Sequence, residues 1–390
     1  MNAAAAQTEH PVIGEIGTLV IGGGIVGTSL GGFLAGDGVE VAVIDAGWPG
    51  GSIANAGSIH VQMQSFFLRD FPQYVPRVER SLPLYRKAVA FWKDFERELG
   101  EDCELKITGG LMIAEDQRQL DFLVKKSRRE TGLGLSVSIM DRREIEKIAP
   151  YLGPAVVGAE FCADEGKINP LLANAALRRW AKRQGAILLN EEPVLRLEAV
   201  GPGFRASTLN GHIRAGRVVL AAGYGGKALA AQLGIAMPAE PEPLHMNITD
   251  ATAPFISHLV QHADRPITLK QFGNGQVVIG GGWPADLAGP GEIPKVRLSS
   301  MIGNVSLAQH IIPKIGALRV VRTWAGLNTN LDGCGVLGGI DAVPGLFFAI
   351  PGSAGYTLGP ISARLVADCV RGRDPGEDIL SNSPDRLADL

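Results

Sequence analysis

The chain has 390 residues with 37 basic and 40 acidic side chains, and its formal net charge is −3. This balance gives no indication of nucleic acid or an anionic membrane surface as the main partner, and we expect neither. The four cysteines include no C-x-x-C pair, which argues against a disulfide framework, a zinc site or an iron–sulfur cluster held by this chain. The first residues lack the basic start and apolar core of a signal peptide, so we expect a cytoplasmic protein with a loose N-terminal lead over residues 1–16.

The stretch from Thr18 to Asp45 predicts a strand, a glycine turn, a helix and a second strand. Gly22, Gly24 and Gly27 have the G-x-G-x-x-G spacing. This spacing lets the backbone turn tightly, approach a pyrophosphate and pack a helix against a strand. Asp45 follows where a carboxylate accepts hydrogen bonds from an adenosine ribose. The stretch therefore predicts a dinucleotide site.

A transmembrane helix is the competing interpretation of residues 18–35, because they contain no charged side chain. So many glycines make a poor helix, and Asp37 and Asp45 bracket a segment that is typical of a strand. We therefore favour the strand, turn and helix, and expect no transmembrane segment.

Elements further along the chain alternate between helical and strand-like patterns. Helices are predicted over residues 82–99, 116–131, 141–150, 170–184 and 297–311, with a last helix that begins near Pro360. Strands or hairpins are predicted within residues 105–114, 158–170, 186–223 and 266–282, and residues 238–250 look like a crossing to another layer. The basic clusters of residues 125–129 and 178–183 are interpreted as solvated helix faces. No linker marks a boundary, so two architectures are expected to interleave along the sequence.

Two further segments are suited to lie against a cofactor. Residues 46–66, AGWPGGSIANAGSIHVQMQSF, are too irregular for a helix and too apolar for a solvated loop. Residues 217–223, RVVLAAG, form an apolar strand that ends in small residues. Both segments would let the backbone pass close to a flat ligand.

In this order, the pieces resemble the flavin oxidoreductases of the D-amino acid oxidase (DAO) family over nearly the whole chain. The motifs that carry the resemblance are VIGGGIVGTSL with Asp45, ANAGS at 54–58, RVVLAAG, WAGL at 324–327, D-G-x-x-x-x-G at 332–338, and PGLFFAIPGSAGYTLGP at 344–360. The forms ANAGSIHVQ and GSAGYTLGP look most like the β subunits of bacterial dye-linked opine dehydrogenases of the octopine and nopaline type.

The resemblance implies an α/β protein with two discontinuous domains. A Rossmann-like FAD-binding domain of the glutathione-reductase type would comprise residues 17–62, 150–238 and 320–390. An α+β substrate domain on a mostly antiparallel sheet would comprise residues 63–149 and 239–319. It also implies noncovalent FAD, hydride transfer from the C–N bond of an N-substituted amino acid such as an opine to flavin N5, and hydrolysis of the resulting imine. Partner subunits with further redox centres, or a dye or quinone, would take the electrons.

The same resemblance implies a set of FAD contacts in all parts of the first domain. These are Gly22, Gly24, Ile25, Val26, Gly27, Asp45, Ala46, Ser52, Asn55, Ala56, Gly57, Ser58, Val194, Ala222, Gly223, Gly352, Ser353, Gly355, Tyr356 and Thr357. The helix after Pro360 would direct its positive end at the charge that develops on the reduced ring.

One position departs from the family pattern. Many members have Arg-Pro directly after W-x-G-L, where the arginine pairs with the substrate carboxylate, but this chain has Asn328 and Thr329. An amide cannot replace that charge, so either another cation serves or the substrate is not an ordinary amino acid. Lys270 and His60 are the leading replacements, although each also fits an ordinary polar residue, and Arg322 and His245 stand behind them. The catalytic set that we predict is His60, Lys270, Asn328 and Tyr356.

Three other functions remain open at this stage. The chain fits a stand-alone glycine, sarcosine or D-amino acid oxidase that uses oxygen, a non-catalytic flavin-holding subunit of a complex, or a nicotinamide-dependent enzyme. A metal site at His258 and His262, which would share a helix face, is disfavoured because no acidic third ligand stands nearby in an expected pattern. Cys334 is expected to be a core or loop thiol and not a covalent flavin link.

Overall fold

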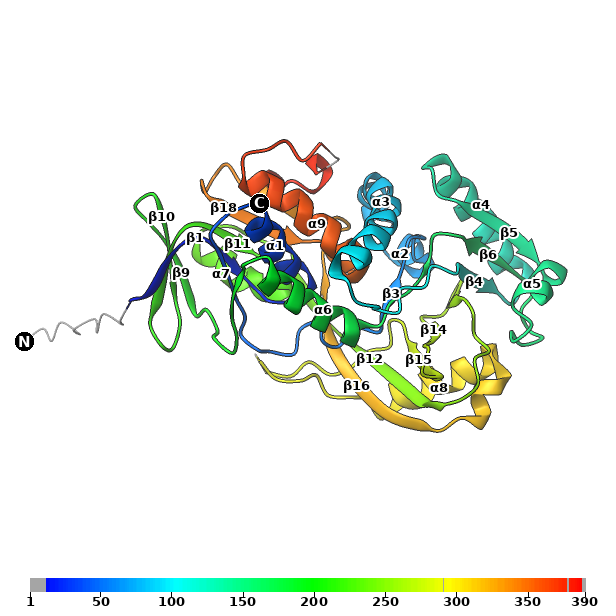
Figure 1. Cartoon of the computed structure of the whole chain (residues 1–390). Helices are drawn as coiled ribbons and strands as arrows, with labels where there is room; N and C mark the ends of the chain where they lie inside the picture. The colour runs from blue at the N-terminus through cyan, green and yellow to red at the C-terminus, as the bar shows by residue number, and fades with distance from the viewer. Residues whose placement is uncertain (1–11, 290, 377–378, 388–390) are drawn as a thin grey trace, which may run out of the picture.

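A computed structural model describes residues 12–289, 291–376 and 379–387. Two eight-stranded sheets lie toward opposite ends of the molecule, and helix α3 (Val75–Leu99) stands between them (Figure 1). A small sheet of β3 (Ser58–Ile59) and β7 (Gly166–Lys167) adds a third, two-stranded element. The chain passes between the two large sheets several times, as the interleaved sequence pattern predicts.

The first sheet has the strand order β17-β18-β11-β1-β2-β8, and β9 and β10 extend it beside β11. Its central pairs are parallel, whereas β9, β10 and β17 pair antiparallel to their neighbours. This is the predicted Rossmann-like arrangement. The strands are β1 (Val12–Ile21), β2 (Val41–Ile44), β8 (Ile187–Leu189), β9 (Arg196–Val200), β10 (Gly203–Ser207), β11 (His212–Leu220), β17 (Val336–Gly339) and β18 (Leu346–Ile350).

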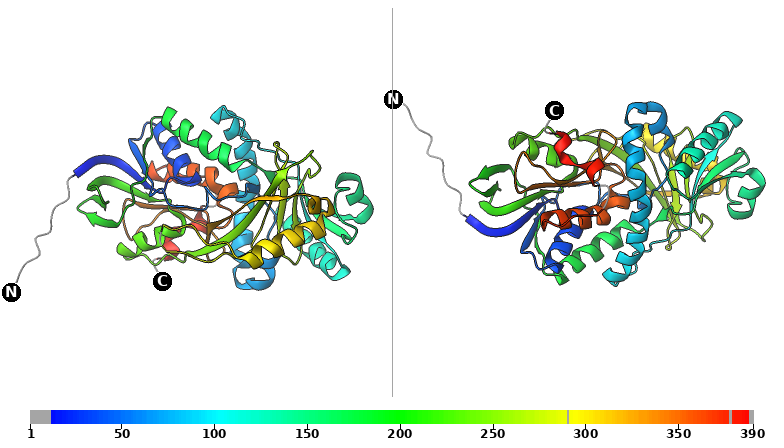
Figure 2. Two further views of the ribbon diagram at one scale, coloured as in Figure 1. Left: turned by 90° about the horizontal axis from the view of Figure 1, so that it is seen from below. Right: turned by 90° about the horizontal axis from the view of Figure 1, so that it is seen from above.

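Helices cover both faces of this sheet (Figure 2). On one face, α1 (Ile25–Gly36) packs between α6 (Pro170–Arg183) and α9 (Gly355–Val370), and α3 packs on α9. Their apolar sides form one core with Phe33, Trp92 and Trp180. The other face carries α7 (Gly226–Gln232) and a second core. Burial on both faces explains why β2 and the end of β1, residues 19–21, are continuous apolar runs.

The second sheet has the order β16-β12-β15-β14-β13-β4-β6-β5, and every pair except β13 with β4 is antiparallel. This confirms the mostly antiparallel sheet. Its strands are β4 (Gly110–Ala114), β5 (Val137–Asp141), β6 (Gly158–Cys162), β12 (Glu240–Ala251), β13 (Leu259–His262), β14 (Thr268–Gln271), β15 (Gln276–Gly280) and β16 (Val320–Asn330).

The two faces of the second sheet have different partners. Leu111 and Ile113 of β4 join a core with α8 (Leu298–Ile311), while the intervening Met112 joins a cluster with α4 (Gln117–Gly132). The short helices α2 (Ser65–Asp70) and α5 (Arg142–Ile148) complete this half. Because side chains alternate along a strand, the face opposite α8 is the one that meets the first domain and the site described below.

Several boundaries differ from those predicted. The last helix begins at Gly355, not near Pro360, and Pro360 lies inside it. A proline cannot donate to the carbonyl four residues earlier, which here belongs to Tyr356. That carbonyl accepts a hydrogen bond from Trp92 Nε1 at 3.1 Å instead, so the helix continues through the proline.

The domain ends also differ in detail. Strand β1 begins at Val12, before the predicted boundary at residue 17, and residues 1–11 of the predicted loose lead lie outside the described residues. Strands β6 and β16 belong to the second sheet, because they pair with β4 and β5 and with β12 respectively. The predicted bounds place both strands in the first domain. Residues 238–250, predicted as a crossing, contain most of the long strand β12.

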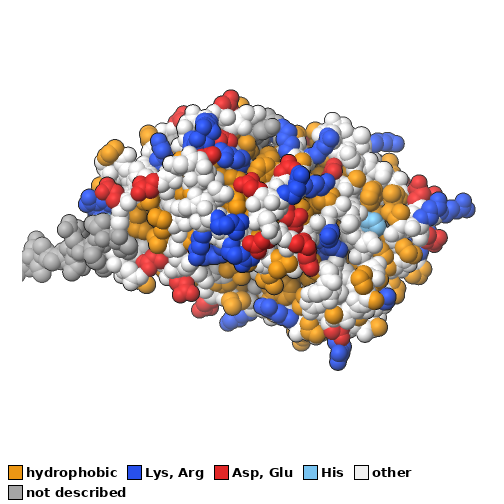
Figure 3. Space-filling model, in the orientation of Figure 1, with side chains coloured by type: hydrophobic (Ala, Val, Ile, Leu, Met, Phe, Trp, Pro, Cys, Tyr) orange, Lys and Arg blue, Asp and Glu red, His pale blue; other side chains and the backbone are white. Residues whose placement is uncertain are grey.

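Two predictions about polar side chains are wrong. Lys126 is predicted on a solvated helix face, but it is buried between carboxylates. His258 and His262 are predicted on a helix, but His262 ends strand β13, His258 directly precedes that strand, and both side chains are buried. Basic and acidic side chains are interspersed over the face in Figure 3. Within the described ranges, no helix has the length and apolar character needed to cross a membrane.

Candidate functional site

A cleft of about 1120 Å³ lies at the carboxyl ends of β1, β2 and β11. Ligands of open α/β sheets bind at this edge. The cleft extends from the glycine turn after β1 to Leu327, Asn328 and Thr329 of β16. Both large sheets therefore contribute to its walls, and its size is sufficient for a dinucleotide-sized ligand.

The glycine turn has a shape that only glycines permit. Gly22 has φ +113°, and a Cβ on it would lie 2.6 Å from the carbonyl oxygen of Ala221. A Cβ on Gly27 would lie 1.8 Å from the carbonyl oxygen of Gly22. Helix α1 thus packs tightly on the turn, and its N-cap Gly24 provides no side-chain cap. Apart from the N–H of Ile25, which donates to Ser52 Oγ, the N–H groups of the first turn of α1 can donate to the phosphates of a ligand.

Two side chains fix the walls around this turn. Asp45 Oδ2 accepts a hydrogen bond from Gly23 N at 2.5 Å, and its Oδ1 accepts one from Gly47 N at 2.8 Å. Ser52 Oγ accepts a hydrogen bond from Ile25 N at 2.9 Å. The carboxylate therefore stands at the end of β2 beside the glycine turn, as the sequence pattern predicts.

Most of the predicted FAD contacts line the cleft. They are Gly22, Gly24, Ile25, Val26, Asp45, Ala46, Ser52, Asn55, Val194, Ala222, Gly223, Gly352, Ser353, Gly355 and Tyr356. The others, Gly27, Ala56, Gly57, Ser58 and Thr357, are not among its lining residues. Gly27 lies behind the turn. Ser58 accepts a hydrogen bond from Lys270 of the second sheet, and Thr357 of α9 accepts one from His60 N.

The structure adds lining residues that the sequence did not reveal. Trp48, Asn174 and Glu192 line the cleft, and Asn174 Nδ2 donates to the carbonyl of Ser52 at 2.8 Å. Asn174 belongs to α6. In the sequence it is indistinguishable from any polar residue on a helix, so its place in the cleft could not be predicted. Trp48 could have been predicted, because it belongs to the glycine-rich segment 46–66 that is expected to lie against the cofactor.

Ser58, His60 and Lys270 come together beside the cleft. The Lys270 ammonium is fully buried and donates to Ser58 Oγ at 2.7 Å. Burial, with a smaller contribution from Lys167, lowers the pKa of Lys270 to about 7. Burial and the charge of Lys270 lower the pKa of His60 to about 3, so that imidazole is neutral near pH 7. Among the described residues, no carboxylate pairs with Lys270, and His60 Nδ1 has no hydrogen-bond partner.

The other predicted catalytic residues are already engaged. Asn328 Nδ2 donates to Glu242 Oε2 at 2.8 Å. The hydroxyl of Tyr356 has two acceptors for its one proton, Pro170 O at 3.3 Å and Asn174 Oδ1 at 3.2 Å. The Tyr356 ring stacks on Trp92, and burial raises its pKa well above the ordinary value. These contacts hold Tyr356 as a packing residue at the start of α9.

The two remaining candidates for binding the substrate carboxylate, Arg322 and His245, lie on opposite faces of the second sheet. Arg322 is exposed, and its guanidinium lies 5.8 Å from the centroid of the Trp324 ring. His245 is in register with Ala325, so it points to the opposite face from Trp324, and it is buried. His245 is therefore not beside the cleft.

Metal and covalent sites find no support in the described ranges. No group of three or more His, Cys, Asp or Glu side chains there is arranged to hold a metal ion. Cys334 is a buried free thiol, and it is absent from the lining of the cleft. Burial raises its pKa, which disfavours the reactive thiolate.

The parallel sheet, the glycine turn and the acidic residue after β2 define a dinucleotide-binding α/β protein, and the antiparallel sheet adds a second wall to the cleft. Comparison with protein families identifies the family within this class. Residues 18–369 match the family described as FAD dependent oxidoreductase (DAO), so the chain belongs to the DAO family. FAD is accordingly its cofactor, and the chain is an oxidoreductase.

Individual relatives are more distant. The chain is 27% identical to the B subunit of opine oxidase from Rhizobium meliloti over 366 residues, which cover 90% of this chain and 92% of that protein. Among solved structures, glycine oxidase from Geobacillus kaustophilus superposes with a TM-score of 0.82 at 23% identity, covering 95% of this chain and 99% of that one. L-Proline dehydrogenase from P. horikoshii gives 0.80 at 24% identity, covering 96% and 98%. These likenesses confirm the fold.

Proposed function

We propose that this chain oxidises the C–N bond of an N-substituted amino acid such as an opine, and that partner subunits, or a dye or quinone, accept the electrons. Two relatives in sequence, at 26–27% identity, are opine oxidase B subunits. The observation that carries the proposal is the position of the positive charge beside the cleft: Lys270 provides it, and residue 328, where many family members have arginine, does not. Asn328 is bound to the chain's own Glu242, while the buried Lys270 ammonium is free of a carboxylate among the described residues.

The cleft residues fit FAD. We assign the glycine turn, Asp45 and the start of α1 to the adenosine diphosphate half, and residues 352–355 to the flavin end. The fit is supported by the positive φ of Gly22 and by the space that a side chain on Gly24 would fill, since its Cβ would lie 2.8 Å from Ser52 Oγ. The position of Cys334 outside the lining of the cleft supports noncovalent binding. Bound FAD supplies the two-electron acceptor.

The chain's own residues bind and orient the substrate. Lys270 anchors a substrate carboxylate from the second sheet, since a charge-assisted hydrogen bond to an ammonium is stronger than a neutral one. His60 accepts a hydrogen bond from the substrate amine, but with a pKa near 3 it is a poor base. The C–H bond is thereby held over the cofactor, and water hydrolyses the resulting imine after oxidation. Tyr356 has no catalytic part in this scheme.

The test is an anaerobic titration of the purified holoprotein, in which flavin absorbance is followed. Octopine and nopaline should bleach the flavin at lower concentrations than glycine, sarcosine or D-amino acids do. With the best substrate, reduction of an artificial dye should be faster than formation of peroxide in air. Preference for glycine with rapid peroxide formation would instead identify a stand-alone oxidase, which the structural likeness to glycine oxidase supports. Absence of bleaching with any substrate would identify a flavin-holding member of a complex.

A further inference from the structure

The segment from Ser58 to Met63 connects the cofactor cleft to the second sheet, and it carries both Ser58 and His60. Only its first two residues are in a strand, where Ser58 pairs with Lys167. After that, its N–H groups donate to side chains. His60 N donates to Thr357 Oγ1 at 3.0 Å, which fastens the segment to α9.

The next two N–H groups share one carboxylate. Glu165 Oε1 accepts hydrogen bonds from Val61 N at 2.8 Å and Gln62 N at 2.9 Å. Its Oε2 accepts from Gln62 Nε2 at 2.9 Å and Gln261 Nε2 at 2.8 Å. Glu165 is fully buried. An ionised carboxylate accepts all four bonds, whereas a carboxylic acid or an amide would turn one acceptor into a donor.

The surrounding chain is shaped to hold this side chain. A Cβ on Gly110 of β4 would lie 1.9 Å from Glu165 Oε2, so a side chain larger than hydrogen at residue 110 would displace the carboxylate. Glu165 lies in the turn between β6 and β7, and β7 is the strand that pairs with β3. The same turn thus holds the segment through its backbone and through a side chain.

Other titratable groups face Glu165 from α4 and β6. The Lys126 ammonium of α4 lies 2.9 Å from Glu130 and 2.7 Å from Glu160, and Cys162 of β6 is a buried thiol. Glu130 Oε1 accepts a hydrogen bond from Met63 N at 2.6 Å. Burial alone would lower the pKa of Lys126, but the two carboxylates outweigh it and raise that pKa. Burial raises the pKa of Glu160 to about 8, although Lys126 opposes this shift.

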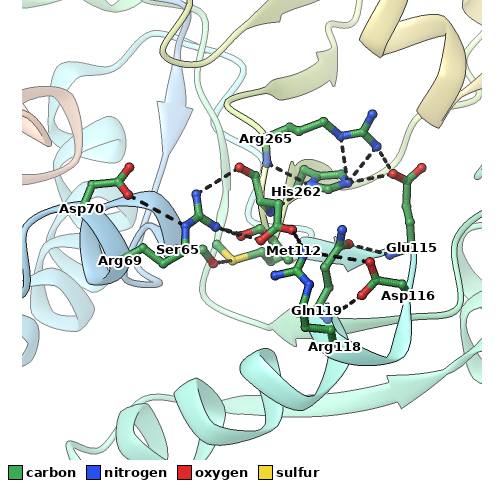
Figure 4. Close-up of polar contacts among 12 residues, drawn as sticks. Ser65, Arg69, Asp70, Met112, Glu115, Asp116, Arg118, Gln119, His262 and Arg265 are labelled. Carbon is green, nitrogen blue, oxygen red and sulfur yellow. Dashed lines mark hydrogen bonds and ion pairs between the residues drawn. The ribbon is translucent and has the colours of Figure 1, made fainter.

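The outer continuation of the segment is held at the surface by a separate set of contacts (Figure 4). Arg69 of α2 donates to the carbonyl of Ala263 at 3.0 Å and to Asp264 Oδ1 at 2.8 Å. Ser65 Oγ contacts Met112 Sδ at 2.7 Å. Because α2 has its own attachment, Glu165 is needed for the inner part beside the cleft and not for the helix.

We propose that Glu165 is a positioning residue: its ionised carboxylate holds residues 58–63 so that Ser58 and His60 are correctly placed beside the cofactor. The inference rests on the proposed function in one respect: it assumes that Lys270, which donates a hydrogen bond to Ser58, binds the substrate carboxylate. The arrangement of the segment does not depend on which substrate the chain oxidises.

The geometry implies a dependence on pH. Burial raises the pKa of Glu165 to about 7, although the N–H donors of Val61 and Gln62 lower it in part. When the pH falls through this value, Glu165 takes up a proton, and one of the four N–H groups loses its acceptor. The segment should therefore be held less firmly at about pH 6 than at about pH 8.

The first test is amide hydrogen exchange of the FAD-loaded protein, which needs no substrate. In Glu165→Gln, the amides of residues 61 and 62 should exchange about tenfold faster, because a buried donor loses its acceptor. The matched control is Glu160→Gln: Glu160 is a buried carboxyl in the same region but has no hydrogen bond to the segment in the described contacts, so exchange there should stay unchanged. Gly110→Ala, which displaces the carboxylate, should reproduce the Glu165→Gln result.

The second readout is the ratio of kcat/KM of the unchanged protein to that of Glu165→Gln, in which ionisation of the substrate cancels. The ratio should rise as the pH increases through about 7, a behaviour that a purely structural residue would not produce. Native exchange at residues 61 and 62 in both variants, with a ratio independent of pH, would overturn the proposal.

If the variants fail to fold, the unchanged protein alone still tests the proposal. Its exchange at residues 61 and 62, relative to amides of α9, should be faster at about pH 6 than at about pH 8, and an equal ratio overturns the proposal. A failure of the proposed substrate would leave these exchange results intact, so the two failures are distinguishable.

Discussion

At the scale of single residues, the candidate site differs from the family pattern in the residue that carries the positive charge: Lys270 carries it, and position 328 has an asparagine. A buried ammonium without a carboxylate is costly, and Lys270 is buried with only Ser58 Oγ as its described hydrogen-bond partner. Binding of a substrate carboxylate would satisfy this charge. At the position where many family members have arginine, Asn328 already has a protein carboxylate as its partner, so a substrate carboxylate would be repelled by Glu242 there.

Replacing Lys270 with methionine should therefore weaken substrate binding. We expect KM to rise by about 10- to 100-fold, which corresponds to the loss of one charge-assisted hydrogen bond. Steady-state kinetics with the best substrate measures this change. Because burial disfavours the ammonium, the variant should fold at least as well as the unchanged protein in thermal unfolding. The exposed Lys125 supplies the control, Lys125→Met, which should keep the native KM.

The same ammonium predicts a pH dependence of binding. Its pKa of about 7 means that the positive charge is present below that pH and is lost above it. For a carboxylate inhibitor that lacks an amine, Kd should rise toward tenfold per pH unit above about pH 7. Titration of the flavin absorbance at several pH values gives these constants. A Kd that stays flat up to about pH 9 would assign the carboxylate to a cation that remains charged, such as Arg322.

At the scale of elements, the sequence predicted the first strand, turn and helix well, because each feature there is local. Gly27 is required by a backbone contact within that unit, and Gly22 by its positive φ, so the spacing alone reveals them. Strand β16 was harder: its motif WAGL was recognised, but its pairing with β12 is a long-range contact. The start of α9 was missed because Trp92, far away in sequence, satisfies the carbonyl that Pro360 leaves free.

The glycine turn gives a sharp test at this scale. In Gly27→Ala, the added Cβ would lie 1.8 Å from the carbonyl oxygen of Gly22, so α1 must move away from the turn. The expected result is loss of most of the bound FAD, seen as a lower ratio of flavin to protein absorbance after purification. Gly132→Ala is the control, because a Cβ there meets nothing within 4 Å. Full flavin content in Gly27→Ala would place the cofactor's phosphates elsewhere.

The buried charges show where sequence patterns stop. Lys126 stands in a basic run on a helix and reads as solvated, yet it lies between Glu130 and Glu160. Glu160 alternates with apolar residues in β6, which marks it only as one side of a strand. Which side is covered depends on α4 and on residues 58–63, and these are brought there by the tertiary fold. The glycine turn and much of the lining of the cleft were therefore predictable, and the network of buried charges was not.

At the scale of the whole molecule, the cleft lies where the two sheets meet. Trp324 Nε1 of β16 donates to the carbonyl of Ala54 at 2.9 Å, and a Cβ on Gly51 would lie 2.8 Å from the carbonyl of Leu327. The glycine-rich segment after β2 is thus packed against the second sheet. A cofactor in the cleft would contact both halves of the molecule and would hold them together.

Removal of FAD should therefore lower the stability of both halves in a single transition. A ligand present at a thousandfold excess over its Kd stabilises the folded state by about 4 kcal/mol, so the flavin-free protein should unfold several degrees lower. Thermal unfolding followed by tryptophan fluorescence measures this difference, because Trp92 and Trp180 report on the first domain and Trp283 and Trp324 on the second. Adding FAD back should restore the original midpoint. If the second-domain signal kept its midpoint without FAD, the cofactor would contact the first domain alone, and the part of β16 in the cleft wall would have no role in holding it.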